Sequence, residues 1–332
     1  SSPFGPDEVH VIFTSGAVEA NNLAVRGIAA ARCPSGNCEC ESKHDRQVVI
    51  SAIEHSSVLE SAEFLMECGW RLDALSVDTA GVVRVDQLAK RISSRTALVS
   101  VTAANHETGT VQPIGRIAAF CREAGVPIHT DAAQTVGKMP ISFRRLGVDA
   151  LSLTAQKFRG PTGVGALVIR SDCPIRPILF GGKQQQGIRP GTEPIAFAAG
   201  LVTALELRVA DLDRWTEKVQ GLRDRFEAIL AERLPGIVVH GGTAERIANT
   251  SNMAFPGCDA RELVRRFGEQ GIDCSTGSAC ESESDEPSQT LRAMQVDAAT
   301  ALASVRFSFG DELDESSLDE VAARICRVVT SF

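Results

Sequence analysis

The sequence predicts an α/β protein in which helices cover a mostly parallel β-sheet and a smaller α+β domain follows. Short apolar runs alternate with helical segments through the first half of the chain, a pattern typical of parallel strands joined by crossover helices. After Pro194 one long helical region leads into a few shorter elements. The 332 residues suffice for two packed lobes. We therefore predict a large domain over residues 1–210 and a small domain over residues 211–332.

The elements of the large domain follow from the spacing of its apolar residues. The expected strands are residues 9–13, 47–51, 71–77, 97–102, 126–130, 149–153 and 166–169. The expected helices are residues 17–32, 57–68, 86–92 and 114–124. Right-handed crossovers bring the loops that leave parallel strands to one edge of the sheet, where ligands bind.

The small domain is expected to begin within the long helical region, which is rich in Ala, Leu, Glu and Arg. That region covers residues 195–233. Three strands are expected at residues 237–240, 250–255 and 303–309. Two helices are expected at residues 260–270 and 315–329.

The charge balance excludes some partners. A net charge of -8 argues against a nucleic acid or an anionic membrane as partner, because both need clustered Lys and Arg. No apolar run is long enough to span a bilayer, and no secretory leader stands out. We expect a cytoplasmic protein, and a mitochondrial or other organellar form stays open.

The 10 cysteines are scattered along the chain, which favours reduced thiols over a disulfide framework. Cys33, Cys38 and Cys40, with His44, form one local cluster that has enough ligands for zinc. Their spacing is not a paired C-x-x-C, and the surrounding residues are polar loop formers. We predict a solvated loop here and no metal site.

Two junctions between strand and helix carry groups that suit a phosphorylated ligand. Gly16 lets the backbone approach an anion closely, and free N–H groups at the start of the next helix attract phosphate. Ser15 or Thr14 acting as an ordinary helix cap is the alternative. His55 follows the second strand, where a purely structural histidine is the alternative.

Three further strand ends add polar groups. Residues 105–107, Asn-His-Glu, form a cluster after the strand that ends at Thr102. Asp131 ends an apolar strand, where an unpaired carboxylate is costly; a pyridinium nitrogen would pair with it, and a helix cap is the alternative. Lys157 lies between an apolar strand and a glycine-rich turn, where its amine could bond a carbonyl cofactor or simply lie at the surface. All five loops together predict a pyridoxal 5'-phosphate (PLP) site.

These segments resemble the cysteine desulfurases of the class V aminotransferase group. That group is built on PLP-transferase fold type I, with a mostly parallel sheet of the seven-stranded type. The resemblance runs from Val11 nearly to the C-terminus, through FTSGAVEANN, EHSSVLES, NHETGTVQPIG, HTDAAQTVGK, AQKFRGPTGVGALVIR, GIRPGTEP, NTSNMAFPG, STGSACESESDEPSQTLRAM and VRFSFG.

The resemblance implies a role for each matching residue around the cofactor. Lys157 bonds the cofactor aldehyde and moves the Cα proton of the substrate, Asp131 pairs with the pyridine nitrogen, and Gln134 reaches the phenolic oxygen. His55 stacks on the ring. The phosphate contacts implied for the chain are Gly16, Ala17, Thr154, Gln156 and, from the other subunit of a homodimer, Thr192.

The same resemblance places the substrate and the nucleophile. Arg306 binds the substrate carboxylate with its planar fork, and His106 touches the substrate. Cys280 is the nucleophile; it lies in a loop of small and polar residues that suits an available thiolate. The small domain thus carries the catalytic cysteine loop. The implied partners are L-cysteine or L-selenocysteine and a sulfur-acceptor or scaffold protein, as in iron–sulfur cluster assembly.

Six positions depart from the family pattern. Gln156 replaces a phosphate-side histidine, Val18 replaces a phosphate-binding threonine, and His106 replaces an asparagine. Lys183, Gln185 and Gln186 alter a glycine-rich run. Losing two charge-assisted phosphate hydrogen bonds costs on the order of 3–6 kcal/mol unless Lys183 compensates, so we expect weaker cofactor binding or a changed substrate.

Three functions follow from these residues. The first is a PLP-dependent cysteine desulfurase that converts L-cysteine to L-alanine and leaves a persulfide on Cys280. The second is a selenocysteine lyase, because the motifs do not distinguish sulfur from selenium. The third is a degenerate, non-catalytic member that acts as a binding or regulatory subunit; the departures favour it, whereas the intact Lys157 and Cys280 oppose it.

Overall fold

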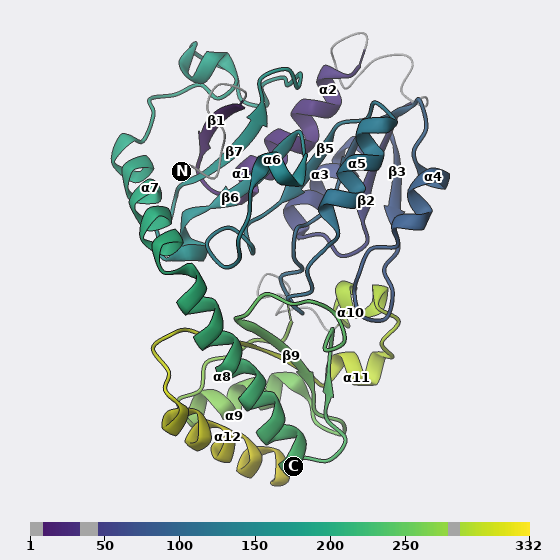
Figure 1. Cartoon of the computed structure of the whole chain (residues 1–332). Helices are drawn as coiled ribbons and strands as arrows, with labels where there is room; N and C mark the ends of the chain where they lie inside the picture. Colours follow the sequence, from purple (N-terminus) through teal and green to yellow (C-terminus); the bar gives the residue numbers. More distant parts are fainter. Residues whose placement is uncertain (1–8, 34–45, 278–285) are drawn as a thin grey trace. The chain divides into compact units, whose positions relative to one another are not determined.

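The computed structural model describes residues 9–33, 46–277 and 286–332, and these residues form two compact units (Figure 1). Unit 1 comprises residues 1–76, 83–103 and 112–210. Unit 2 comprises residues 211–332 together with two short excursions from the first half of the chain, residues 77–82 and 104–111.

Unit 1 is built on a seven-stranded sheet with the order β1-β7-β6-β5-β4-β2-β3. Its strands are β1 (Val9–Thr14), β2 (Gln47–Ser51), β3 (Arg71–Leu75), β4 (Thr96–Ser100), β5 (Ile128–Asp131), β6 (Ala150–Thr154) and β7 (Gly165–Arg170). β7 runs antiparallel to both of its neighbours, and the remaining pairs are parallel. The sheet is therefore mostly parallel, as predicted, and all seven expected strands are present to within a few residues.

Helices cover both faces of this sheet: Figure 1 shows α5 and α6 in front of the strands and α1 and α3 behind them. The helices are α1 (Ala17–Asn22), α2 (Ala29–Ala31), α3 (Ser56–Glu67), α4 (Leu88–Arg91), α5 (Ile114–Glu123), α6 (Phe143–Leu146) and α7 (Ile195–Ala210). The 3₁₀ turns are η3 (Val85–Gln87), η4 (Ala155–Phe158) and η5 (Gln184–Gly187). The helix expected over residues 17–32 is interrupted by a π-helical stretch, η1 (Leu23–Ile28), and π-turns of this kind often accompany functional sites.

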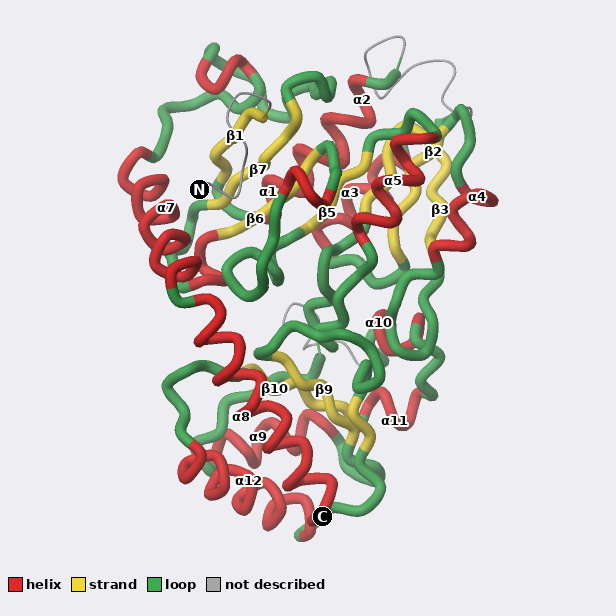
Figure 2. Tube along the Cα trace, in the orientation of Figure 1, coloured by secondary structure: helices red, strands yellow, loops and turns green. Residues whose placement is uncertain are grey.

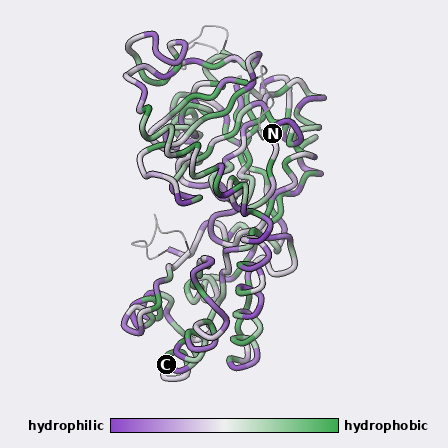
Figure 3. Tube along the Cα trace, turned by 60° about the vertical axis from the view of Figure 1, so that its left-hand side comes forward, coloured by the Kyte–Doolittle hydropathy of each residue, from purple (hydrophilic) through white to green (hydrophobic). Residues whose placement is uncertain are grey.

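The core of unit 1 lies where α1, η1 and α3 pack on the sheet. Buried aliphatic residues from the helices, such as Leu23, Ile28 and Leu65, meet Val48 and Leu167 of the strands. Figure 3 shows the corresponding pattern of apolar (green) and hydrophilic (purple) stretches along the chain. The apolar residues of these segments share the helix face that packs on the sheet, as in amphipathic helices.

Unit 2 packs helices on a three-stranded antiparallel sheet of order β10-β9-β8 (Figure 2). Its elements are α8 (Leu212–Arg233), β8 (Val238–Val239), β9 (Thr250–Ala254), α9 (Ala260–Glu269), α10 (Gln289–Ala293), α11 (Ala298–Leu302), β10 (Ser304–Ser308) and α12 (Glu315–Thr330). Phe226, Phe255 and Phe307 meet edge to face in its core, with ring centroids 5.1 to 6.3 Å apart.

The single helix expected over residues 195–233 is two helices, because the chain leaves helical geometry at Asp211 (φ -113°, ψ 7°) between α7 and α8. The short helices α6, α10 and α11 were not expected, since helices of four or five residues show no apolar period. Among the helices of the described residues, none has the length and apolar character needed to cross a membrane.

Gly165 provides a test of how tightly β7 fits. A Cβ at Gly165 would lie 2.6 Å from Leu153 O and 2.7 Å from the carbonyl carbon of Gly16, and neither backbone can yield cheaply. We expect Gly165→Ala to lower the free energy of unfolding by about 1–3 kcal/mol in urea titrations. Gly115→Ala is the control: its site in α5 is open, so a gain of about 0.5–1 kcal/mol is expected. Equal stability of the two variants would contradict the close fit.

Candidate active site

The loops that the sequence singled out leave the same edge of the unit 1 sheet. β1 and β6 both pair with β7 in antiparallel fashion, so they run in the same direction, and the ends of both face Gly165: Thr14 and Thr154 are its register partners. β5 is parallel to β6, with Asp131 opposite Ser152. The loops that follow β1, β2, β5 and β6 are therefore brought to one edge, as the crossover rule predicts.

Asn21 joins two predicted site residues through its buried amide. Its Nδ2 donates to Asp131 Oδ2 at 2.7 Å and to Ser57 Oγ at 2.8 Å. The second oxygen of Asp131 accepts from Ala133 N at 2.9 Å. Asp131 is only 6% exposed, so these donors replace the water that its carboxylate loses. The alternative role for Asp131, a helix cap, is not borne out, since a turn and no helix directly follows β5.

His55 is the N-cap of α3, and its ring orientation is fixed by Ser57. His55 Nδ1 accepts from Ser57 N at 3.1 Å and lies 2.8 Å from Ser57 Oγ. Because Ser57 Oγ accepts from Asn21, its own proton points to Nδ1, which leaves the ring hydrogen on Nε2. A continuous chain of hydrogen bonds thus runs from Asp131 through Asn21 and Ser57 to His55.

The start of α1 fits a phosphate better than the sequence alone indicated. The alternative in which Ser15 or Thr14 caps this helix is not borne out, because α1 has no side-chain cap. Thr14 Oγ1 donates to Gly16 O, and Ser15 N donates to Glu19. Gly16 itself adopts φ 157° and ψ -178°, a conformation that essentially only glycine tolerates. The first amides of the helix are consequently left to an anion.

Thr154 and Lys157 belong to this same corner of unit 1. Thr154 is buried at the end of β6, and a Cβ at Gly16 would lie 3.7 Å from Thr154 Oγ1. Lys157 and Gln156 are on η4 and exposed, whereas Ala155 and Phe158 are buried. The amine of Lys157 is thus carried at the surface of a firmly anchored turn and not held in the core. Ala17 begins α1.

Gln134 has a partner that the sequence did not reveal. Lys138 is 7% exposed, and its Nζ donates to Gln134 Oε1 at 2.7 Å. Both residues belong to the turn after β5. Gly137 of that turn lies against Phe158: a Cβ at Gly137 would be 2.6 Å from Phe158 Cβ. The turn that carries Gln134 is therefore packed directly on η4.

Glu54, which precedes His55, is a second residue without an expected role. Its Oε1 accepts from Thr102 N at 2.8 Å and from Ser51 Oγ, and among the described residues its buried Oε2 has no partner. Burial, reinforced by the nearby charge of Asp131, raises the pKa of Glu54 to about 8. The side chain is therefore a neutral acid near pH 7.

Residues 183–186, which depart from the family's glycine-rich run, contact the edge strand β1. Gln185 pairs with the edge strand β1 as another strand would: Phe13 N donates to Gln185 Oε1 at 2.6 Å, and Gln185 Nε2 donates to Phe13 O at 2.9 Å. Gln185 and Gln186 both have positive φ, 46° and 61°, where glycine is usual. Lys183 and Thr192 are exposed on either side of this segment.

The predicted substrate residues lie in unit 2. Arg306 is on β10, and its Nη1 donates to His106 O at 3.1 Å. His106 Nε2 is 3.8 Å from Glu107 Oε1. The buried Glu107 also accepts from Ser288 Oγ at 2.7 Å, and a Cβ at Gly277 would lie 2.7 Å from its Oε2. Cys280, the predicted nucleophile, lies outside the described residues.

The other thiols differ from an active nucleophile. Burial raises the pKa of Cys121, Cys173 and Cys274 to about 12. Cys33 is buried in the core of unit 1, while Cys38, Cys40 and His44 lie outside the described residues. In the described part of the chain no three His, Cys, Asp or Glu side chains gather in a way that could hold a metal ion.

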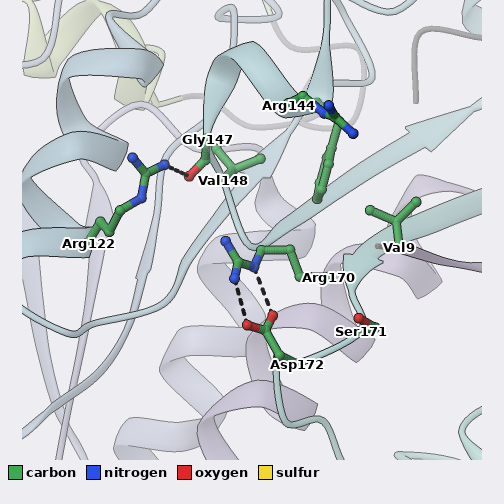
Figure 4. Close-up of a pocket in the computed structure, with 9 residues that line it drawn as sticks. Val9, Arg122, Arg144, Gly147, Val148, Arg170, Ser171 and Asp172 are labelled. Carbon is green, nitrogen blue, oxygen red and sulfur yellow. Dashed lines mark hydrogen bonds and ion pairs between the residues drawn. The ribbon is translucent and has the colours of Figure 1, made fainter. Parts of the chain in front are cut away.

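A cavity of about 330 Å³ lies at the other end of β6, beside Val148 and Arg170 (Figure 4). Two of its three arginines are paired: Arg122 donates to Gly147 O, and Arg170 forms a two-pronged pair with Asp172. Because Lys157 follows the opposite end of the strand, this cavity is separate from the candidate site.

Comparisons with known proteins point in one direction. Residues 5–321 match the family model "Aminotransferase class-V". The chain is 38% identical to "Cysteine desulfurase IscS" of Dictyoglomus turgidum over 306 residues, which cover 92% of this chain and 75% of that protein. It is 39% identical to the "IscS-like cysteine desulfurase" of Mycobacterium tuberculosis, over 93% of this chain and 78% of that protein.

Solved structures agree. A "NIFS-LIKE PROTEIN" superposes with a TM-score of 0.87 at 30% identity, over 97% of this chain and 83% of that chain. The structure "SspA in complex with cysteine" superposes with a TM-score of 0.75 at 31% identity, over 90% of this chain and 81% of that chain.

The raised pKa of Glu54 predicts a pH dependence of stability. The folded protein holds this proton more tightly than the unfolded chain, so the free energy of unfolding falls as the pH rises between about 5 and about 8. Glu54→Gln has no proton to lose in this range. The free energy of unfolding of this variant should therefore rise relative to that of wild type by about 1 kcal/mol per pH unit. Urea unfolding of the cofactor-free proteins measures the slope. The exposed Glu60→Gln variant should follow wild type; identical slopes for all three would show that Glu54 is ionised in the fold.

Proposed function

Because the chain belongs to the class V aminotransferase family, and within it to the cysteine desulfurases, we propose that it takes sulfur from L-cysteine through Lys157 and Cys280. The products are L-alanine and a persulfide on Cys280. The balance is closed: the Cβ–S bond of cysteine breaks, an S–S bond to Cys280 forms, and the thiol proton of Cys280 goes to the carbon skeleton. Neither an external oxidant nor a reductant is needed.

Enzymes of this family depend on PLP, and the residues of unit 1 fit that group. The uncapped start of α1, the glycine-only conformation of Gly16 and the buried Thr154 suit its phosphate. The carboxylate of Asp131 at the end of β5 suits a protonated ring nitrogen. When bound, PLP supplies an aldehyde that takes up an amine and a ring that withdraws electrons from the substrate.

The proposed roles in unit 1 divide between orientation and proton transfer. Asp131, held by Asn21 and Ala133, keeps a proton on the ring nitrogen. His55, whose imidazole is held by Ser57, would stack on the ring. Lys157 is on an exposed turn, so its amine would be available to hold the aldehyde of bound PLP and, when free, to take the proton from the substrate Cα.

In unit 2, Arg306 is proposed to bind the substrate carboxylate, because its planar fork matches that group. His106, on which Arg306 rests through the backbone, would lie beside the same substrate. Cys280 lies between Gly277 and Ser288 in the sequence. Glu107 accepts a hydrogen bond from Ser288, and a Cβ at Gly277 would lie 2.7 Å from Glu107 Oε2. We propose that Cys280 then passes its sulfur to an acceptor or scaffold protein.

L-Selenocysteine is the alternative substrate, since the same residues would cleave its weaker C–Se bond. The assignment to PLP-dependent enzymes disfavours the non-catalytic alternative. A cytoplasmic location also stays a proposal. "SspA in complex with cysteine" shows that a relative of this fold holds that amino acid, which supports L-cysteine as the first substrate to test.

A homodimer is proposed from α7. This helix is apolar, yet Leu201 is its one buried residue among those described, and Ile195 and Leu207 are 77% and 68% exposed. A helix that is apolar around most of its surface is normally covered. A second copy would cover it, and the exposed Thr192 just before α7 would then be available to the partner's phosphate site.

The dimer predicts an effect on association. The double variant Ile195→Glu, Leu207→Glu should lower the association constant of the dimer at least tenfold. Burying each of these apolar side chains contributes roughly 1.5–3 kcal/mol to association. Sedimentation velocity at micromolar concentration measures it. Leu302→Glu in α11 is the control for adding charge at an exposed leucine. A wild-type protein that sediments as a monomer with its cofactor bound would refute the dimer.

The proposed chemistry separates two residues that an assay can tell apart. Lys157→Ala should lose both the borohydride-fixed label at position 157 and all product formation, whereas Cys280→Ser should keep the label and lose sulfide release by at least 100-fold. Alanine, sulfide and selenide are measured side by side with L-cysteine and L-selenocysteine. Cys274→Ser, at a thiol of raised pKa, is the matched control and should stay active. Activity in Lys157→Ala equal to wild type would overturn the proposal.

A further inference from the structure

The ammonium of Lys138 is buried within unit 1, where a lysine is rare unless its charge is used. Its Nζ lies 2.7 Å from Gln134 Oε1. An ammonium group can only donate, so the amide atom that faces it has to be the oxygen. The NH2 group of Gln134 is consequently turned to the other side of the amide.

The backbone around this pair is fixed. Thr135 N donates to Ala132 O and Lys138 N donates to Thr135 O, both at 3.0 Å. Gly137 has φ 74° and lies so close to Phe158 that a Cβ would be 2.6 Å from it. Since Phe158 follows Lys157 directly, the Lys138–Gln134 contact is held against the turn that carries the cofactor-binding amine.

We propose that Lys138 is a positioning residue for the cofactor: it fixes the Gln134 amide so that the NH2 group meets the phenolic oxygen of PLP. This inference rests on the proposed function, in which Gln134 reaches that oxygen. The shape of an amide does not distinguish its two ends, so the side chain alone does not determine which end faces the ring. The contact with the Lys138 ammonium determines which end of the amide faces the ring.

The orientation has a chemical consequence. A hydrogen bond donated to the phenolic oxygen favours its negatively charged form, whereas an amide oxygen in the same place would oppose that charge. The proton shared between the Lys157 nitrogen and the phenolic oxygen is then released at lower pH. Lys138 would thereby tune how readily the amine of the substrate displaces the Lys157 amine from the cofactor.

The test is a pH titration of the visible absorption of the bound cofactor. In Lys138→Met, which keeps the length of the side chain and removes its charge, the midpoint should rise by about one pH unit, a tenfold change in proton affinity. Gln134→Glu should shift it in the same direction, because a carboxylate keeps the contact with Lys138 but cannot donate to the phenolic oxygen. Lys90→Met, on α4, is the control and should titrate as wild type.

A double-mutant cycle shows whether Lys138 acts through Gln134. In a Gln134→Leu background, Lys138→Met should cause no further shift of the midpoint; an equal shift in both backgrounds would overturn the positioning role. Thermal unfolding of the cofactor-free variants checks that each folds. Borohydride labelling separates the two proposals: an unlabelled wild-type Lys157 refutes the proposed function, whereas a labelled Lys138→Met with a wild-type midpoint refutes only the role of Lys138.

Discussion

One buried amide organises the candidate site. Asn21 has two amide protons and gives one to Asp131 and one to Ser57, so the residue proposed for the ring nitrogen and the residue proposed for the ring face are placed by the same group. Because a desolvated donor or acceptor is costly when left unpaired, each bond in this chain fixes the direction of the next. The π-turn begins two residues after Asn21, where the helix departs from regular geometry.

The strand arrangement decides which residues can join this network. By placing β7 antiparallel between β1 and β6, the fold turns the chain back and brings the start of α1 beside the end of β6. The approach is close enough that only glycine fits at position 165, against the backbone of Gly16. The conformation of Gly16, which we propose to bind phosphate, and the anchoring of the Lys157 turn thus depend on the two pairings of β7.

Much of this was predictable because apolar spacing reports strands and long helices directly. The seven strands of unit 1 and the polar residues at their ends follow from that spacing, and Asp131 and Lys157 stand out as charges after apolar runs. Asn21 and Lys138 could not be found in the same way. Asn21 sits inside a helix and Lys138 in a polar turn, and their importance lies in contacts with Asp131 and Gln134 that only the tertiary fold creates. The sequence also could not show that α1 lacks a cap. Ser15 has the right chemistry for a cap, but Gly16 holds the backbone in another geometry.

The buried groups near Asp131 share one electrostatic property: they are neutral. His129 lies between Ser100 and Ser152, at 2.9 Å from each hydroxyl, and burial lowers its pKa to about 3. Glu54 carries a proton at neutral pH for the same reason, with its pKa raised to about 8. Asn21 and Ser57 have no charge at all. In a site of low dielectric constant, neutral neighbours neither cancel nor repel the charge of a carboxylate. In the proposed site, the charge beside the pyridine nitrogen is then that of Asp131 alone, whereas the phenolic side is governed by the Gln134 amide that Lys138 orients, so separate residues act on the two ends of the ring.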